Sequence, residues 1–123
     1  MVNNEIYEIY AIKYAHSERR TGDNFIGGDA HDGPMPLDYF VWAITNKKRT
    51  IILDTGFSLD TAKIRGREYL RNPGAGLGMI GIEPSKIKNV IISHMHYDHS
   101  GNEKLFPNAD RKSTRLNSSH SEI

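Results

Sequence analysis

Cysteine is absent from the 123-residue sequence, which excludes a disulfide framework and thiolate metal ligands. No apolar run approaches the ~18 residues that a membrane span requires, and residues 1–5 lack the basic and apolar regions of a signal peptide. The formal net charge is only +1, so neither a nucleic acid nor an anionic membrane is expected as a partner. These absences predict a soluble, cytoplasmic protein whose length suits one domain with a modest core.

Side chains that can bind a metal ion are concentrated in one short stretch of the sequence. This stretch follows residues 89–92, an apolar run that predicts a short buried strand. Within six residues it contains three histidines and one carboxylate: His94, His96, Asp98 and His99. Imidazole nitrogen and carboxylate oxygen suit zinc and similar divalent ions. Surface-loop histidines are the alternative interpretation, but crowding four such side chains together requires a reason.

The spacing divides these four residues into two pairs. His94 and His96 are two positions apart, so both can face one ion, whereas Asp98 and His99 are adjacent and can turn toward a second ion. Two ions roughly 3.5–4 Å apart would clamp a hydrolytic water and the oxygen of the group that it attacks. The sequence therefore predicts two divalent metal ions, with Zn²⁺ as the expected metal.

The sequence Ser-His-Met-His-Tyr-Asp-His-Ser-Gly at residues 93–101 resembles the signature of the metallo-β-lactamase-fold hydrolases. Ile-Ile-Leu-Asp-Thr-Gly at residues 51–56 resembles the motif that ends a strand just upstream in that family. The likeness runs over residues 5–109, includes residues 31–42, and is closest to the N-acyl homoserine lactonase-like group. It implies an α/β (α+β) fold: the N-terminal half of an αββα sandwich, in which a mixed sheet carries helices on one face.

The resemblance also implies a function. The full-length protein would be a dinuclear zinc hydrolase that opens the ester of a lactone, such as an N-acyl homoserine lactone, in the manner of quorum-quenching enzymes. His94, His96, Asp98 and His99 would be the metal ligands, and Asp98 would also assist proton transfer to the leaving alkoxide. The partner would be a small-molecule lactone or ester substrate. The alternatives are a thioester hydrolase or β-lactamase of the same fold, and an inactive or structural metal-binding domain.

Two further groups of residues are assigned by their positions. Asp54 is expected to accept a hydrogen bond from a ligating imidazole and so fix its tautomer; the alternative is an aspartate that merely ends a strand. Residues 16–35 form a long polar loop with four glycines. A loop of this length is either functional or a solvated surface loop. As a substrate lid it would supply Phe25 and Ile26 as apolar contacts.

Apolar alternation and turn residues predict the remaining elements. Strands are expected at residues 5–14, 38–45, 49–54 and 90–92, the second and third of them as a hairpin. A helix is expected at residues 58–70, with Ser58 as its N-cap, before a break at residues 72–76. One helical turn is expected at residues 83–87, and a further helix begins at residues 102–106.

Residues 110–123 change character, with few apolar residues and no periodicity. Residues 110–120 resemble the conceptual translation of a sequencing adapter. We expect a partial metallo-β-lactamase-fold domain at residues 1–109 and a non-native, adapter-derived, disordered tail at residues 110–123. The resembled family takes further ligands from downstream of its first motif, so we expect weak metal binding and little catalysis from this chain. An uncovered sheet face would also allow a homodimer.

Overall fold

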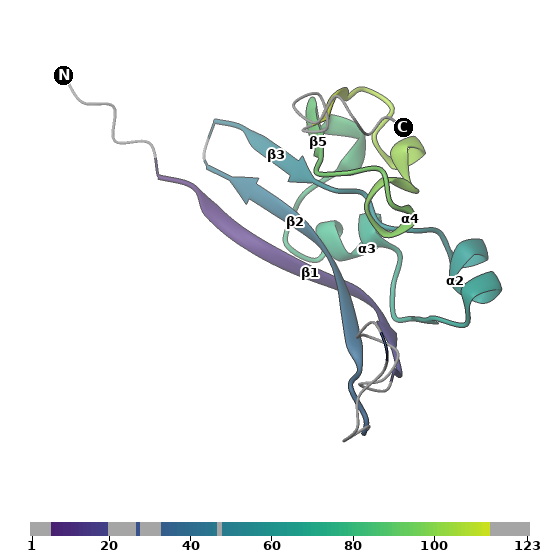
Figure 1. The fold of residues 1–123 in the computed structure, drawn as a ribbon. Helices are drawn as coiled ribbons and strands as arrows, with labels where there is room; N and C mark the ends of the chain where they lie inside the picture. The colour runs from purple at the N-terminus through teal and green to yellow at the C-terminus, as the bar shows by residue number, and fades with distance from the viewer. Residues whose placement is uncertain (1–5, 20–26, 28–32, 47, 114–123) are drawn as a thin grey trace.

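The computed structural model describes residues 6–19, 27, 33–46 and 48–113. Six strands of this part of the chain form one mixed sheet in the order β4-β1-β2-β3-β5-β6. Figure 1 shows β1, β2 and β3 side by side. The bounds of the six strands are β1 Glu8–Ser17, β2 Leu37–Thr45, β3 Thr50–Leu53, β4 Glu68–Tyr69, β5 Asn89–Ile92 and β6 Asp110–Ser113. Neighbours from β4 to β3 pair antiparallel, whereas β3, β5 and β6 run parallel. The predicted α/β fold with a mixed sheet is confirmed.

Short helical segments connect the strands: α2 Leu59–Arg65, α3 Pro73–Gly78, η1 Pro84–Lys86, α4 Tyr97–Ser100 and η2 Glu103–Leu105. α2 begins as predicted, because Ser58 Oγ accepts a hydrogen bond from the Thr61 N–H at 3.3 Å. It ends at Gly66, whose φ of 68° is left-handed, so the prediction that it reaches residue 70 is wrong. Within the described ranges, no helix combines the length and apolar character that crossing a membrane requires.

Two other expectations about local structure need correction. The predicted break at residues 72–76 is wrong, since Asn72 caps α3 and Pro73 lies in its first turn, where its missing N–H costs no helical hydrogen bond. Residues 110–113 form β6, which pairs in parallel with β5, so this part of the expected tail is not disordered. Residues 114–123 lie outside the described residues, and the non-native origin of the segment stays a prediction.

One face of the sheet is buried under the helical segments. Its core includes Tyr14, Val41, Ile52 and Val90 from the strands and Ala62 and Leu77 from α2 and α3. α3 approaches β1 so closely that a Cβ atom at Gly76 would lie 2.5 Å from Ile12 Cγ2. The alternate positions of the same strands are apolar but only partly buried: Phe40, Trp42, Ile44, Ile51, Leu53 and Ile91. The helices therefore cover one face, and the other keeps an apolar surface.

Candidate metal centre

The candidate site lies where two parallel neighbouring strands end. β3 and β5 pair with Leu53 opposite Ile91, so the residues that follow these strands meet at one edge of the sheet. Asp54 follows β3, and its N–H donates to the Ile91 carbonyl at 2.8 Å. Ser93 follows β5, and the chain then turns through the histidines into α4. The sheet thereby brings two separate sequence motifs side by side.

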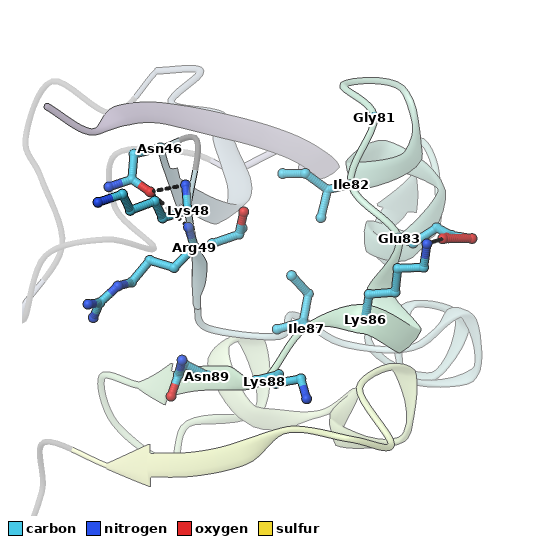
Figure 2. A pocket seen from close by; sticks show the side chains of 11 residues that line it. Asn46, Lys48, Arg49, Gly81, Ile82, Glu83, Lys86, Ile87, Lys88 and Asn89 are labelled. Carbon is cyan, nitrogen blue, oxygen red and sulfur yellow. Dashed lines mark hydrogen bonds and ion pairs between the residues drawn. The ribbon is translucent and has the colours of Figure 1, made fainter. Parts of the chain in front are cut away.

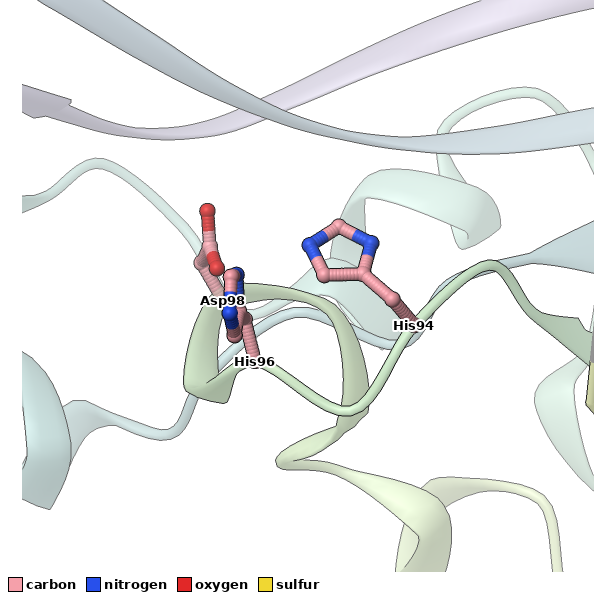
Figure 3. A group of neighbouring side chains, drawn as sticks. All are labelled: His94, His96 and Asp98. Atoms are coloured by element: carbon pink, nitrogen blue, oxygen red, sulfur yellow. The ribbon is translucent and has the colours of Figure 1, made fainter. Parts of the chain in front are cut away.

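The predicted metal ligands converge at this edge (Figure 3). One donor atom each from His94, His96 and Asp98 lie within 4.8 Å of one another. His99 adjoins this group: its Nε2 lies 3.3 Å from Asp98 Oδ2, and its ring centroid lies 4.0 Å from that of His94. All four residues that the sequence singled out are therefore neighbours in space.

Asp54 is buried beside this cluster, with 2% of its surface exposed. Its Oδ2 lies 2.7 Å from His99 Nδ1, and its Oδ1 accepts from the Ser93 N–H at 2.7 Å. The residue has a φ of 66°, a left-handed conformation that costs energy outside glycine and is typical of functional sites. Asp54 was predicted to accept a hydrogen bond from a ligating imidazole, and its contact with His99 Nδ1 is of that kind.

Ser93 extends this contact to His94. A carboxylate only accepts hydrogen bonds, so the Ser93 hydroxyl donates to Asp54 at 2.9 Å. The Ser93 oxygen then accepts from His94 Nδ1–H at 3.1 Å. Both His94 and His99 are left with Nε2 as the nitrogen that carries a lone pair, which a metal ligand needs. Sequence reasoning missed Ser93, although its place between a strand end and the first histidine was a usable signal.

The electrostatics of the site favour a neutral His94. Burial lowers the pKa of His94 below its ordinary 6.5, and the neighbouring His99 and His96 lower it further. Neutral imidazole is the form that binds metal, because protonation removes the lone pair. His96 is exposed, and its ring meets that of His94 edge-on with centroids 4.5 Å apart. The cluster therefore has a buried side next to the sheet and an open side at His96.

Backbone hydrogen bonds fasten this segment to the residues after β3. The Thr55 N–H donates to the His99 carbonyl, and the Gly101 N–H donates to the Gly56 carbonyl, each at 2.8 Å. A Cβ atom at Gly101 would lie 2.8 Å from the Gly56 oxygen, so the approach requires glycine. The segment from His99 to Gly101 is thereby held against the end of β3.

The donor set fits a divalent ion such as zinc. Two imidazoles and a carboxylate within 4.8 Å of one another can be brought by side-chain rotation to the ~2.0–2.2 Å that zinc–ligand bonds require. Asp98 Oδ2 also lies beside His99 Nε2, so the fourth donor adjoins the other three. Of the other residues assigned from the sequence, Phe25 and Ile26 lie outside the described residues, and their role as a lid stays a prediction.

A hollow of about 430 Å³ lies at the opposite edge of the sheet, where β3 and β5 begin (Figure 2). Ile82 and Ile87 contribute apolar surface, and its cationic side chains are Lys48, Arg49, Lys86 and Lys88. These charged residues are exposed, and Lys86 pairs with Glu83 at 3.1 Å. Ligand sites hold polar groups in fixed directions, so the histidine cluster is the stronger candidate for a functional site.

The fold and the histidine cluster together define a class of protein. The sequence profile described as the metallo-beta-lactamase superfamily matches residues 34–122, and the chain belongs to that superfamily. The matched range contains both the Asp54 motif and the His94–His99 segment.

Similar proteins include several lactone hydrolases. The chain is 32% identical over 95 residues to the N-acyl homoserine lactonase AttM of Azorhizobium caulinodans, covering 67% of this chain and 35% of that protein. A solved N-acyl homoserine lactone hydrolase, with the product N-hexanoyl-L-homoserine at its catalytic metal centre, is 16% identical with a TM-score of 0.61, covering 85% and 46% of the two chains. The dizinc quorum-quenching lactonase AidC is 17% identical with a TM-score of 0.62, covering 89% and 42%. The chain thus spans less than half of each of these proteins.

Proposed function

We propose that the chain carries part of the active site of a metal-dependent hydrolase that opens the ester ring of a lactone. The observation that carries this proposal is that four side chains converge where β3 and β5 end: His94, His96, Asp98 and His99. N-acyl homoserine lactones are the best-supported substrate class, because AttM is named for them and a similar structure holds the hydrolysed product. A quorum-quenching role would follow from that substrate class.

The chain's donors would hold two ions. His94 and His96 would hold one, while Asp98 and His99 would hold the other, with Zn²⁺ as the proposed metal. The dizinc centre named for AidC supports this number. When bound, such ions supply Lewis acidity and lower the pKa of bound water to about 7. Asp54 would keep the imidazoles in the tautomer that binds metal.

Asp98 is proposed to move the proton in the reaction. In lactone opening, the water oxygen bonds to the carbonyl carbon, the carbon–oxygen bond of the ring breaks, and the leaving alkoxide takes a proton. Asp98 has 25% of its side chain exposed while its Oδ2 contacts His99, so it is accessible from outside the protein as well as in contact with the cluster. Phe25 and Ile26 are proposed to contact the acyl chain.

Four donors are few for two catalytic ions, since a catalytic zinc takes three protein ligands and keeps one open position. We therefore propose that the chain by itself binds metal weakly and catalyses little. Further ligands would have to come from other residues. The cytoplasmic location and the homodimer stay predictions.

The test compares this chain with the complete product of its gene, sequenced from an independent clone through and beyond codon 123. With Zn²⁺, the complete product should open N-hexanoyl homoserine lactone, measured as acid release at constant pH. A chelator should stop the reaction, His99→Ala should abolish it, and His16→Ala should not. Preferred cleavage of a thioester or a β-lactam would refute the substrate class. If none of these substrates is hydrolysed in a metal-dependent way, the proposed function is wrong.

A further inference from the structure

Tyr14 joins the first strand to the candidate metal site through a buried hydroxyl. The side chain is 0% exposed. Its Oη donates to the Asp98 carbonyl at 3.0 Å and accepts from the Phe57 N–H at 3.3 Å. Asp98 lies 84 residues from Tyr14 along the chain, and Phe57 lies 43 residues away. One hydroxyl therefore fastens three distant segments together.

The Asp98 carbonyl that accepts this hydrogen bond lies between two proposed metal ligands. It belongs to the peptide that links Asp98 to His99, and a peptide unit is planar. A hydrogen bond to its oxygen therefore restricts backbone rotation at both residues. Their side chains leave the backbone at either end of this unit and meet again where His99 Nε2 lies 3.3 Å from Asp98 Oδ2. The hydroxyl thus acts on a peptide that is flanked by two proposed metal ligands.

Packing leaves the Tyr14 ring little freedom to move. The ring meets that of Phe57 edge-on with centroids 5.0 Å apart. A Cβ atom at Gly56 would lie 2.7 Å from Tyr14 Cζ, so the end of the ring fits only because residue 56 is glycine. The hydroxyl cannot leave the Asp98 carbonyl unless the ring or the backbone shifts.

We propose that Tyr14 is a positioning residue of the metal centre, which fixes the Asp98–His99 peptide so that both side chains face the same place. Tyr14 itself touches neither metal nor substrate. The consequence for metal binding rests on the proposed function, whereas the fastening of the peptide does not. A residue that only filled the core would be replaced equally well by phenylalanine.

Tyr69 offers a matched control in the same aromatic cluster. Its ring lies 6.2 Å from that of Phe57, and its hydroxyl donates to the Phe57 carbonyl at 3.2 Å. Tyr14→Phe and Tyr69→Phe each remove one hydroxyl and keep the ring. Of these two hydroxyls, the one of Tyr14 bonds to the 94–101 segment, whereas the one of Tyr69 bonds to Phe57.

The first measurement is amide hydrogen exchange in the metal-free chain, with a chelator present. The Thr55 and Gly101 amides report on the segment, because each of their hydrogen bonds joins it to the residues after β3. Tyr14→Phe should speed their exchange roughly fivefold to tenfold through the loss of a buried hydrogen bond. Tyr69→Phe should leave them near the wild-type rate. Equal acceleration in the two variants would overturn the inference.

A second measurement needs no variant and decides the matter even if Tyr14→Phe does not fold. In the wild-type chain, the Tyr14 hydroxyl proton should exchange slowly with water. In mixed H₂O and D₂O, the carbonyl carbon of Asp98 should show an isotope shift from the protonated and deuterated hydroxyl. A rapidly exchanging hydroxyl without that shift would contradict the hydrogen bond.

Titration with Co²⁺, followed by visible absorption, tests the consequence for metal binding. Tyr14→Phe should weaken Co²⁺ binding about tenfold, as outer-shell substitutions do, and Tyr69→Phe should not. Equal Co²⁺ affinity in the two variants would overturn the positioning role. If the exchange and Co²⁺ differences are found but lactones are not hydrolysed, the role of Tyr14 stands and the proposed function falls.

Discussion

Two histidine–aspartate pairs in the structure share a contact distance but differ in their surroundings. His99 Nδ1 lies 2.7 Å from Asp54 Oδ2 at the candidate metal centre. His16 Nδ1 lies 2.7 Å from Asp38 Oδ1, where β1 and β2 pair near the end of β1. The side chain of Asp54 is 3% exposed, whereas that of Asp38 is 41% exposed. The distance alone therefore does not distinguish a metal-site pair from a surface pair.

The groups around each histidine ring do distinguish the two pairs. His16 Nε2 bonds to Glu18, so both of its nitrogens face carboxylates. The hydrogen bond with Asp38 raises the pKa of His16 above its ordinary 6.5, and the contact with Glu18 raises it further. The raised pKa favours an imidazolium, which has no lone pair for a metal. Both nitrogens of His99 also face carboxylates, since its Nε2 lies 3.3 Å from Asp98 Oδ2. However, the ring of His94 lies beside that of His99, with centroids 4.0 Å apart. The neighbouring imidazoles, rather than the carboxylates, therefore separate the candidate metal-binding histidine from the surface one.

The two carboxylates also differ in what else they contact. Asp54 accepts hydrogen bonds from both the N–H and the hydroxyl of Ser93 inside the protein. Asp38 meets Lys13 at 3.1 Å on an exposed surface. Removing one member of a buried network leaves other polar groups unsatisfied, while water and salt screen an exposed pair. Substitutions at the buried pair should therefore have the larger effects.

Asp54→Ala should have the largest effect. It would leave the Ser93 N–H and His99 Nδ1–H without an acceptor, so we expect the free energy of unfolding to fall by about 2–4 kcal/mol and Co²⁺ affinity to fall roughly 10–100-fold. Urea denaturation with a chelator and Co²⁺ titration would measure these changes. Asp38→Ala is the control and should leave Co²⁺ affinity unchanged. If both variants lost the same affinity, the contrast between the pairs would be wrong.

His99→Ala should reduce both metal content and stability. It removes a proposed ligand and leaves the buried Asp54 carboxylate without one of its donors, so we expect fewer Co²⁺ ions per chain at saturation and a loss of about 1–2 kcal/mol in the metal-free chain. His16→Ala should leave the number of bound ions unchanged, because His16 belongs to a separate surface group with Asp38 and Glu18. Calorimetric titration gives the number of ions. Equal loss of ions in the two variants would refute the distinction.

Ser93→Ala should have a smaller effect, confined to His94. Without the Ser93 hydroxyl, His94 Nδ1–H loses its acceptor, so both neutral tautomers of the ring should be populated and Co²⁺ affinity should fall about tenfold. Nitrogen-15 chemical shifts of His94 in the metal-free chain report the tautomer. Ser93→Thr keeps the hydroxyl and should restore the wild-type pattern. A single unchanged tautomer in Ser93→Ala would show that Asp54 does not act on His94 through Ser93.

The sequence identified the group of candidate metal ligands because its members are nearly contiguous along the chain, at residues 94–99. The role of Asp54 could also be proposed from the sequence, because a carboxylate at the end of a strand can reach few other polar groups. The Ser93 contact depends on side-chain torsions, and the Tyr14 contact joins residues 84 positions apart. Neither leaves a local pattern in the sequence.

Prediction of the secondary structure has the same limit, because it also depends on local patterns in the sequence. Ser58 could be predicted as the N-cap of α2, because an N-cap interacts only with residues close to it in sequence. Proline is favoured in the first turn of a helix and also follows helix ends, so the start of α3 at Pro73 was mistaken for a break. Residues 110–113 have no apolar alternation, and their strand depends on pairing with β5. His16 was assigned to a loop, although β1 continues through it to Ser17.

The pH dependence of stability gives the smallest expected effect and tests the exposed pair directly. Because the pKa of His16 is raised above 6.5 by Asp38, protonated His16 stabilises the fold fully below that pH, and the stabilisation is lost as the pH rises through the raised pKa. The pKa of Asp38 is lowered below 3.8 by His16, so its contribution is present above that pH and lost as the pH falls. Both contributions are present between pH 3.8 and 6.5. In low salt with a chelator, His16→Gln should therefore lower the melting temperature more at pH about 5.5 than at pH about 8.5. The same decrease at both pH values would mean that His16 acts through packing rather than charge.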